Sequence, residues 1–91
     1  MSATARVRVR AHGRVQGVFF RDSVRREAAR RGVAGWASNE PDGSVEAVFE
    51  GDSEAVQALV DLCRRGPGHA EVERLDVEEE PPEGLDGFRV R

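Results

Sequence analysis

The chain has 91 residues, which is enough for one domain and too few for two. Charged residues make up 34% of it and hydrophobic residues 38%, a balance that is typical of a globular domain and too apolar for a disordered chain. The net charge of −3 argues against a general nucleic-acid binder, because a basic surface supplies most of the affinity of such proteins.

The single cysteine and the N-terminal residues bear on the cellular compartment. Cys63 has no partner for an intrachain disulfide, which suits a reducing cytoplasm. The first residues lack a long apolar run, so we expect no signal peptide and no membrane partner. The sequence thus predicts a cytoplasmic protein, and its small size suits a monomer.

The first two predicted elements are a strand and a helix. Residues Arg6 to His12 alternate strictly between apolar and polar, which predicts a half-buried strand with one wet or partly covered face. The period becomes helical at Phe20, and we expect a helix from Phe20 to Arg31 that stops at Gly32. The apolar positions of the two elements are Val7, Val9 and Ala11 in the strand and Phe20, Val24 and Ala28 in the helix.

A hairpin follows the first helix. Val33 to Asn39 and Ser44 to Glu50 are predicted strands, and Pro41-Asp42-Gly43 between them is a turn signal. The inward positions of the second of these strands are Val45, Ala47 and Phe49.

The remaining elements are a helix and two strands. Asp52 or Ser53 is a candidate side-chain cap for the helix, which Gly66-Pro67-Gly68 terminates. Ala70 to Glu80 predicts a strand with a bulge between Val72 and Leu75, and Phe88 and Val90 indicate a short terminal strand. The expected buried stripe of the helix is Val56, Leu59, Val60 and Cys63.

The order of these elements defines the fold class. Two strand-helix-strand units with right-handed crossovers predict an α+β, ferredoxin-like split β-α-β sandwich. Both helices then cover one face of a mainly antiparallel sheet of four to five strands. We expect residues 1–91 to form a single domain, with the first strand central and the loop after it at one end of the sheet.

The loop from Gly13 to Arg21 carries the first functional signal. A helix N-terminus offers unpaired N–H groups to an anion, and glycines let successive amides point into one concavity. Arg21 lies in the first helical turn, where its planar guanidinium can bind two phosphate oxygens. Since a strand-to-helix loop also carries glycine merely to turn, this pattern alone leaves an anion site and a plain turn both open.

The residues that this loop lacks limit its chemistry. It has no Gly-Lys-Ser/Thr ending of a nucleotide-binding P-loop and no serine or cysteine nucleophile. The chain shows no cluster of metal ligands at a recognisable spacing. We therefore expect a site for a small phosphate-like anion, with no metal and no cofactor. His12 lies beside the loop, but the strand alternation favours a surface role for it.

Asn39 ends the second predicted strand beside the turn. Its amide both donates and accepts, so it can hold a water molecule next to a bound anion. An asparagine before a turn often caps the backbone instead, and this alternative stays open from the sequence. We expect Trp36, in the same segment, to serve packing rather than chemistry.

Together the two segments resemble the acylphosphatase family. The first motif, Gly-x-Val-Gln-Gly-Val-x-Phe-Arg, runs from Gly13 to Arg21, and the second, Gly-aromatic-x-x-Asn-x-x-x-Gly-x-Val, runs from Gly35 to Val45. The resemblance covers essentially the whole chain. Many members carry a basic residue where this chain has Ser38, so an extra charge contact there is in doubt.

The resemblance implies an enzyme that hydrolyses the carboxyl-phosphate bond of acyl phosphates, without a metal and without a phosphoenzyme. It implies that Arg21 and the loop amides hold the phosphoryl group and that Asn39 positions the attacking water. Inorganic phosphate is then a product and a competitor. The loop residues expected to bind substrate are Val15, Gln16, Gly17, Val18, Phe19 and Phe20.

Two other functions are compatible with the same fold. One is a non-catalytic regulatory module that binds phosphate or another anion, which would keep the loop but tolerate loss of Asn39. The other is an RNA binder, since RNA-recognition domains share this fold and stack bases on aromatic residues of central strands. The first strand here has no aromatic residue and the chain is acidic, so we expect no nucleic-acid partner.

Overall fold

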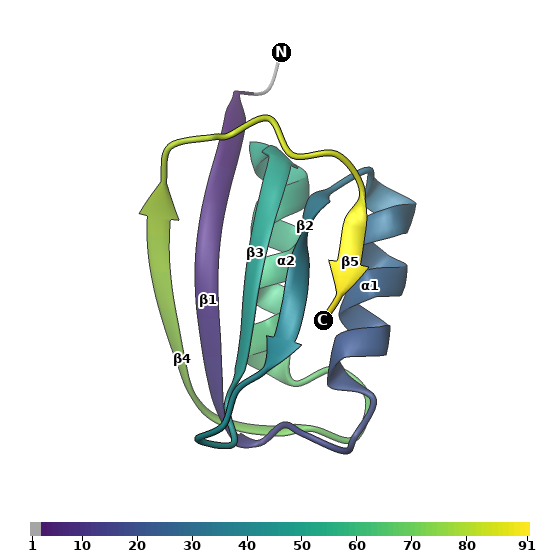
Figure 1. Ribbon diagram of the computed structural model, residues 1–91, viewed down its shortest axis with the longest axis vertical. Coiled ribbons are helices and arrows are strands. Elements are labelled where there is room, and N and C mark those ends of the chain that lie inside the picture. The colour runs from purple at the N-terminus through teal and green to yellow at the C-terminus, as the bar shows by residue number, and fades with distance from the viewer. Residues whose placement is uncertain (1–2) are drawn as a thin grey trace.

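A computed structural model describes residues 3–91 of the chain. It contains five strands and two helices, and it confirms the predicted order of the elements (Figure 1). The elements are β1 (Thr4–Arg14), α1 (Phe20–Arg31), β2 (Ala34–Asn39), β3 (Val45–Asp52), α2 (Ser53–Arg65), β4 (Glu71–Glu80) and β5 (Phe88–Val90).

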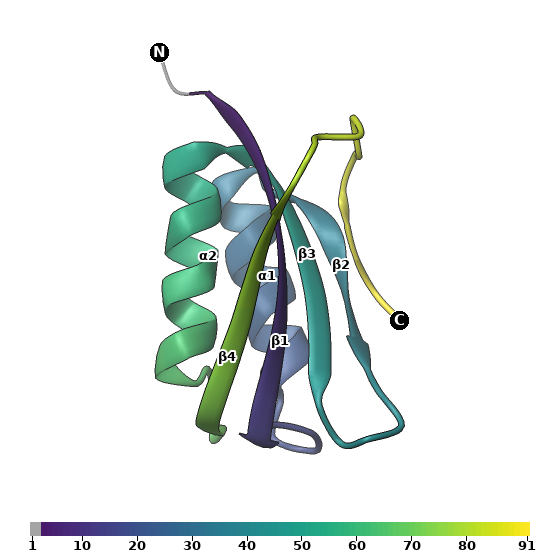
Figure 2. The same ribbon diagram turned by 90° about the vertical axis from the view of Figure 1, so that its left-hand side faces the viewer.

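The strands form one sheet in the order β4-β1-β3-β2-β5. All neighbouring pairs are antiparallel except β2 and β5, which run parallel. Both helices lie on one side of this sheet (Figure 2). The fold is therefore the predicted α+β ferredoxin-like sandwich, with β1 inside the sheet and its following loop at one end.

The core lies between the helices and the sheet. The apolar positions predicted for β1, α1, β3 and α2 are all buried, and Phe49 and Leu59 are the largest fully buried side chains. Burial of each such side chain contributes about 1.5–3 kcal/mol, so this layer holds α1 and α2 in place. The pKa of the Cys63 thiol is raised to about 12 by burial, which makes Cys63 a core residue rather than a nucleophile.

The β1–β4 pairing contains the bulge that the sequence predicted. Its register shifts between His12 and Gly13, which face Arg74 and Val72, so Glu73 is the extra residue on β4. A Cβ at Gly13 would lie 2.4 Å from the Glu71 carbonyl oxygen, so only glycine fits this close approach. The bulge thus lies where β1 ends and the loop that leads to Arg21 begins.

Several strand ends differ by one or two residues from the sequence prediction, and one predicted cap is absent. The second strand begins at Ala34, because the Val33 N–H is used to close α1 on the Ala28 carbonyl, at 2.8 Å. Asp52 is the N-cap of α2, but no side-chain hydrogen bond caps this helix. The expected side-chain cap at Asp52 or Ser53 is therefore wrong.

The sheet face opposite the helices is more covered than the alternation of β1 suggests. Arg6 on this face is only 4% exposed, and its guanidinium lies 3.3 Å from Glu50 and 2.9 Å from Glu80. The segment between β4 and β5 crosses the sheet here, at the end that lies away from the functional loop (Figure 1). Residues 83, 84 and 85 of this segment donate their backbone N–H groups to the Glu50 carboxylate at 2.7–2.8 Å. Glu50 therefore holds the segment that leads into β5 against the sheet.

We expect Glu50→Gln to lower the free energy of unfolding by about 2 kcal/mol, because it leaves Arg6 and the segment's N–H groups without their buried anion. The corresponding fall in melting temperature is roughly 10 °C for a domain of this size. Thermal denaturation followed by circular dichroism measures it, with the exposed Glu79→Gln as matched control. A loss no larger than that of the control would contradict the assigned role.

The same carboxylate predicts an acid-dependent stability. The Glu83 backbone N–H holds the pKa of Glu50 below its ordinary value of 4.5, assisted by Leu85, Gly84 and Arg6 against the effect of burial. A carboxylate whose pKa is lower in the folded chain than in the unfolded chain stabilises the fold at pH values above the unfolded-state pKa. This stabilisation is lost as the pH falls through the folded-state pKa. The stability difference between wild type and Glu50→Gln should accordingly shrink below pH 4.5.

Candidate functional site

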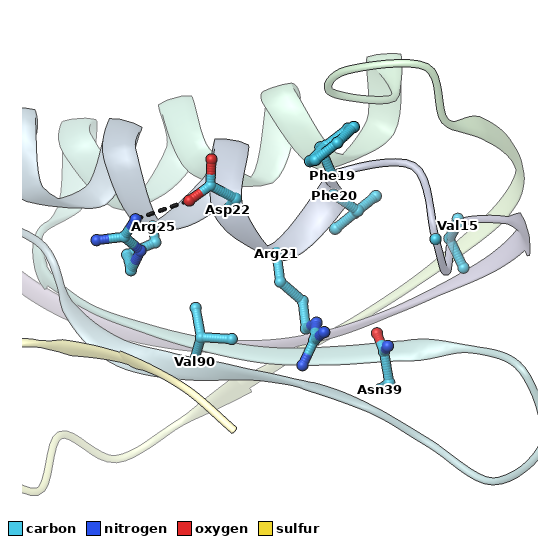
Figure 3. Close-up of a pocket in the computed structure, with 9 residues that line it drawn as sticks. Val15, Phe19, Phe20, Arg21, Asp22, Arg25, Asn39 and Val90 are labelled. Atoms are coloured by element: carbon cyan, nitrogen blue, oxygen red, sulfur yellow. Dashed lines mark hydrogen bonds and ion pairs between the residues drawn. The ribbon is translucent and has the colours of Figure 1, made fainter.

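A pocket of about 380 Å³ opens where the N-terminus of α1 faces the end of β2 and the edge strand β5 (Figure 3). It brings together six of the eight residues that the sequence singled out. The predicted residues that line it are Val15, Gly17, Phe19, Phe20, Arg21 and Asn39, and it also takes in Asp22, Arg25 and Val90.

The loop between β1 and α1 has an unusual backbone. Phe19, the N-cap of α1, has φ 62 and ψ 23, and it is the one non-glycine residue with positive φ within residues 3–91. A side chain in this left-handed region costs about 1–3 kcal/mol and persists only where the surroundings enforce it. The sequence does not reveal this strain, because nothing about phenylalanine favours that conformation.

The strained turn leaves the helix N-terminus open. No side chain caps α1, and no protein acceptor within residues 3–91 takes a hydrogen bond from the backbone N–H groups of residues 16–20. These groups carry the positive end of the helix dipole. The loop therefore presents a cluster of unpaired donors at the pocket, as an anion site requires.

Two predicted loop residues lie outside the pocket lining. Gln16 donates from Nε2 to the carbonyl oxygens of Glu40 and Ser44, at 2.8 and 2.9 Å, and so ties the loop to the β2–β3 turn. Val18 is buried, and its carbonyl accepts the His69 N–H at 3.4 Å. The side chains of Gln16 and Val18 thus hold the loop in shape, and any contact that these two residues make with substrate has to come from their backbone amides.

Arg21 extends from α1 toward the Asn39 side chain on β2 (Figure 3). Its Nη1 donates to the backbone oxygen of Arg91 at 2.6 Å, which is the only hydrogen bond of its guanidinium within the described chain. Arg91 is itself held, because its N–H donates to the Ala37 carbonyl at 2.8 Å and its guanidinium stacks on Trp36 at 4.3 Å from the ring centroid. Arg21 is therefore oriented at one nitrogen and keeps its other donors for a ligand.

The alternative that Asn39 caps the turn is excluded by the geometry of that turn. Asp42 does the capping, since its carboxylate accepts the Ser44 backbone N–H at 2.9 Å and the Ser44 hydroxyl at 2.6 Å. Within residues 3–91 the Asn39 amide has no hydrogen-bond partner, and it points into the pocket toward Arg21 (Figure 3). It is available to a water molecule or a ligand.

Three pocket residues were missed by the sequence reasoning. Val90 comes from β5, opposite Ala37 of β2, and Arg25 lies one helical turn beyond Arg21. Asp22 pairs with Arg25 at 2.7 Å and with Arg26 at 3.1 Å, and the bond to Arg25 is the main reason why the pKa of Asp22 is lowered. The i,i+4 spacing of the two arginines was a usable signal. The position of Val90 could not be predicted from the sequence, because it depends on where β5 joins the sheet.

Other candidate groups lie elsewhere. The His12 Nε2 atom lies 2.9 Å from the Asp76 carboxylate on β4, and His12 does not line the pocket. No group of three or more histidine, cysteine or carboxylate side chains within residues 3–91 has an arrangement that could hold a metal ion. Within the same range, neither α1 nor α2 combines the length and apolar composition that crossing a membrane requires.

The chain is similar to several known proteins. The Acylphosphatase family model matches residues 7–90. An acylphosphatase from Rubrobacter xylanophilus is 62% identical over 89 residues, covering 97% of this chain and 81% of its own. One from Gloeobacter violaceus is 56% identical over 90 residues, covering 99% and 97%. The solved structure of an acylphosphatase from Coxiella burnetii superposes with a TM-score of 0.90 at 38% identity, covering 97% of this chain and 93% of that one.

Proposed function

Because the chain belongs to the acylphosphatase family and hydrolyses acyl phosphates, we propose that Arg21 and the loop amides hold the phosphoryl group while Asn39 holds the attacking water. The observation that carries this proposal is the convergence of three elements on one pocket: unpaired N–H groups, the Arg21 guanidinium and the unpartnered Asn39 amide. The loop residues proposed to contribute are Val15, Gln16, Gly17, Val18, Phe19 and Phe20.

The phosphoryl group needs charge stabilisation more than covalent help. In a loose phosphoryl-transfer transition state, negative charge spreads over the equatorial oxygens, and fixed donors that face these oxygens lower the barrier. The planar guanidinium of Arg21 binds two of them, and the N–H groups at the start of α1 bind the remainder. Since α1 and β1 are anchored in the core, these donors need no rearrangement when the charge develops.

The water and the leaving group need few protein groups. Asn39 accepts a hydrogen bond from water and donates one to a phosphoryl oxygen, which places the water oxygen next to phosphorus. The bond from this oxygen to phosphorus forms as the bond from phosphorus to the bridging oxygen breaks, and the departing carboxylate keeps the electron pair. A carboxylate whose acid has a pKa of about 4 leaves without protonation. The water proton passes to the phosphate, so no dedicated base is needed.

Loss of benzoyl phosphate absorbance with purified protein tests the proposal, with inorganic phosphate as inhibitor. We expect metal-independent turnover in the presence of a chelator, and competitive inhibition because phosphate occupies the same loop. Inhibition that leaves KM unchanged would place the phosphate site elsewhere.

The cellular setting is a separate part of the proposal. We propose that residues 1–91 form one domain that acts as a cytoplasmic monomer on small acyl phosphates and binds no nucleic acid. The shared core of all elements, the lone buried Cys63 and the acidic net charge support this view. Light scattering after size exclusion tests the monomer, since a mass of twice 10.0 kDa would contradict it.

A further inference from the structure

One end of the pocket is not used by the proposed chemistry. The loop and Asn39 lie on one side of Arg21, and Val90 and Arg25 lie on the other (Figure 3). The chain order agrees with this view, because Arg25 is one turn, about 5.4 Å, further along α1 and Val90 is level with Ala37, two residues before Asn39. The pocket therefore continues from the phosphoryl position into a section between α1 and β5.

The direction of the reaction assigns this section to the acyl group. The attacking and leaving oxygens of a phosphoryl transfer lie roughly in line on opposite sides of phosphorus. If the water is held by Asn39, the leaving carboxylate points away from Asn39, toward Val90 and Arg25. The acyl substituent then passes over the Val90 side chain, which is 40% exposed.

Charge at the far end of this section is positive. Arg25 and Arg26 share the single carboxylate of Asp22, so two guanidinium groups face one anion. Within residues 3–91, the Arg25 guanidinium makes one hydrogen bond, from Nη2 to Asp22 at 2.7 Å, and its side chain is 49% exposed. Its remaining N–H donors are available at the pocket, which Arg26 does not line.

We propose that Arg25 is a specificity-determining residue that favours acyl phosphates whose acyl part carries a second negative group. This inference rests on the proposed function, because it uses the placement of phosphorus between Arg21 and Asn39. The ligand chemistry is an acyl phosphate with a second anionic group on its acyl part, so that Arg21 binds the phosphoryl end and Arg25, one helical turn further along α1, binds the other end. Acyl phosphates with an uncharged acyl part are hydrolysed at the same centre without this contact.

The experiment compares two aromatic acyl phosphates of nearly equal size. 4-Carboxybenzoyl phosphate carries the second anion, and 4-carbamoylbenzoyl phosphate replaces it with a neutral amide. We expect the wild type to favour the carboxylate about fivefold in kcat/KM, as suits a half-exposed charge pair. Arg25→Gln should remove this preference. Arg26→Gln is the matched control, since Arg26 pairs with the same Asp22 outside the pocket, and it should keep the preference within about twofold.

Salt dependence supplies a second readout. A preference that comes from charge should fall as ionic strength rises from about 0.01 M to 1 M, because the screening length contracts over this range. An unchanged ratio in Arg25→Gln, whether or not both rates fall together, would overturn the inference and leave the proposed function standing. Failure of the wild type to hydrolyse benzoyl phosphate itself would contradict the proposed function, and the inference with it.

Discussion

Arg21→Lys should lower kcat/KM for benzoyl phosphate by about 10³-fold, which is the effect typical of an arginine that stabilises a transferring phosphoryl group. Lysine keeps the positive charge but replaces a planar pair of donors with one compact ammonium group, so it cannot bind two equatorial oxygens together. It also changes the contact by which the Arg91 backbone oxygen orients the side chain. Steady-state kinetics measures the loss.

Arg14→Lys is the matched control for this substitution. Arg14 belongs to the same motif and is exposed at the end of β1, but it does not line the pocket. We expect its kcat/KM to stay within about twofold of the wild type, as for a surface arginine that only steers anions. Equal losses in the two variants would contradict the bidentate role of Arg21, because both substitutions keep the positive charge and Arg14 lies outside the pocket lining.

Asn39→Ala should reduce kcat by about 10²-fold with little change in KM, because the amide positions the water and its contact with a phosphoryl oxygen strengthens as charge develops in the transition state. The fold should survive, since within residues 3–91 the Asn39 side chain makes no hydrogen bond and the turn is held by Asp42 and Ser44. Kinetics and the melting temperature, measured on the same preparation, separate the two effects.

Ser38→Ala controls for a change at the end of β2. The Ser38 hydroxyl donates to Glu40 at 3.1 Å and lies outside the pocket lining. We expect near-normal turnover from this variant. If Asn39→Ala turned over benzoyl phosphate as fast as Ser38→Ala, the water-positioning role of Asn39 would be contradicted.

Most of the fold could be predicted because short-range patterns decide it. Val7, Val9 and Ala11 alternate with a period of two, and Phe20, Val24 and Ala28 follow a helical period, so the buried faces could be assigned from the sequence. Gly32 marked the end of α1 because a glycine readily adopts the left-handed conformation found there, with φ 67. The burial of Arg6 could not be predicted in this way, because its partners Glu50 and Glu80 are 44 and 74 residues away in the sequence.

Part of the site could likewise be predicted from the sequence, and part depends on long-range packing. Arg21 and Asn39 belong to local motifs and could be named from the sequence, although their meeting in one pocket depends on the sheet order. The left-handed conformation of Phe19, the Arg91 backbone contact and the position of Val90 come from long-range packing. Gln16 was predicted to bind substrate, and because its side chain is committed to the β2–β3 turn at 2.8 and 2.9 Å, only its backbone amide is left for that role.

The proposed attack of water held beside Asn39 on phosphorus in the Gly13–Arg21 loop determines which bond of the substrate is cleaved. Hydrolysis of benzoyl phosphate in water enriched in ¹⁸O tests this most directly, with mass spectrometry of both enzymatic products. We expect one ¹⁸O atom in inorganic phosphate and none in benzoate, because the phosphorus-oxygen bond breaks. Enzyme-dependent incorporation of ¹⁸O into benzoate would mean attack at the carbonyl carbon and would contradict the proposed attack on phosphorus.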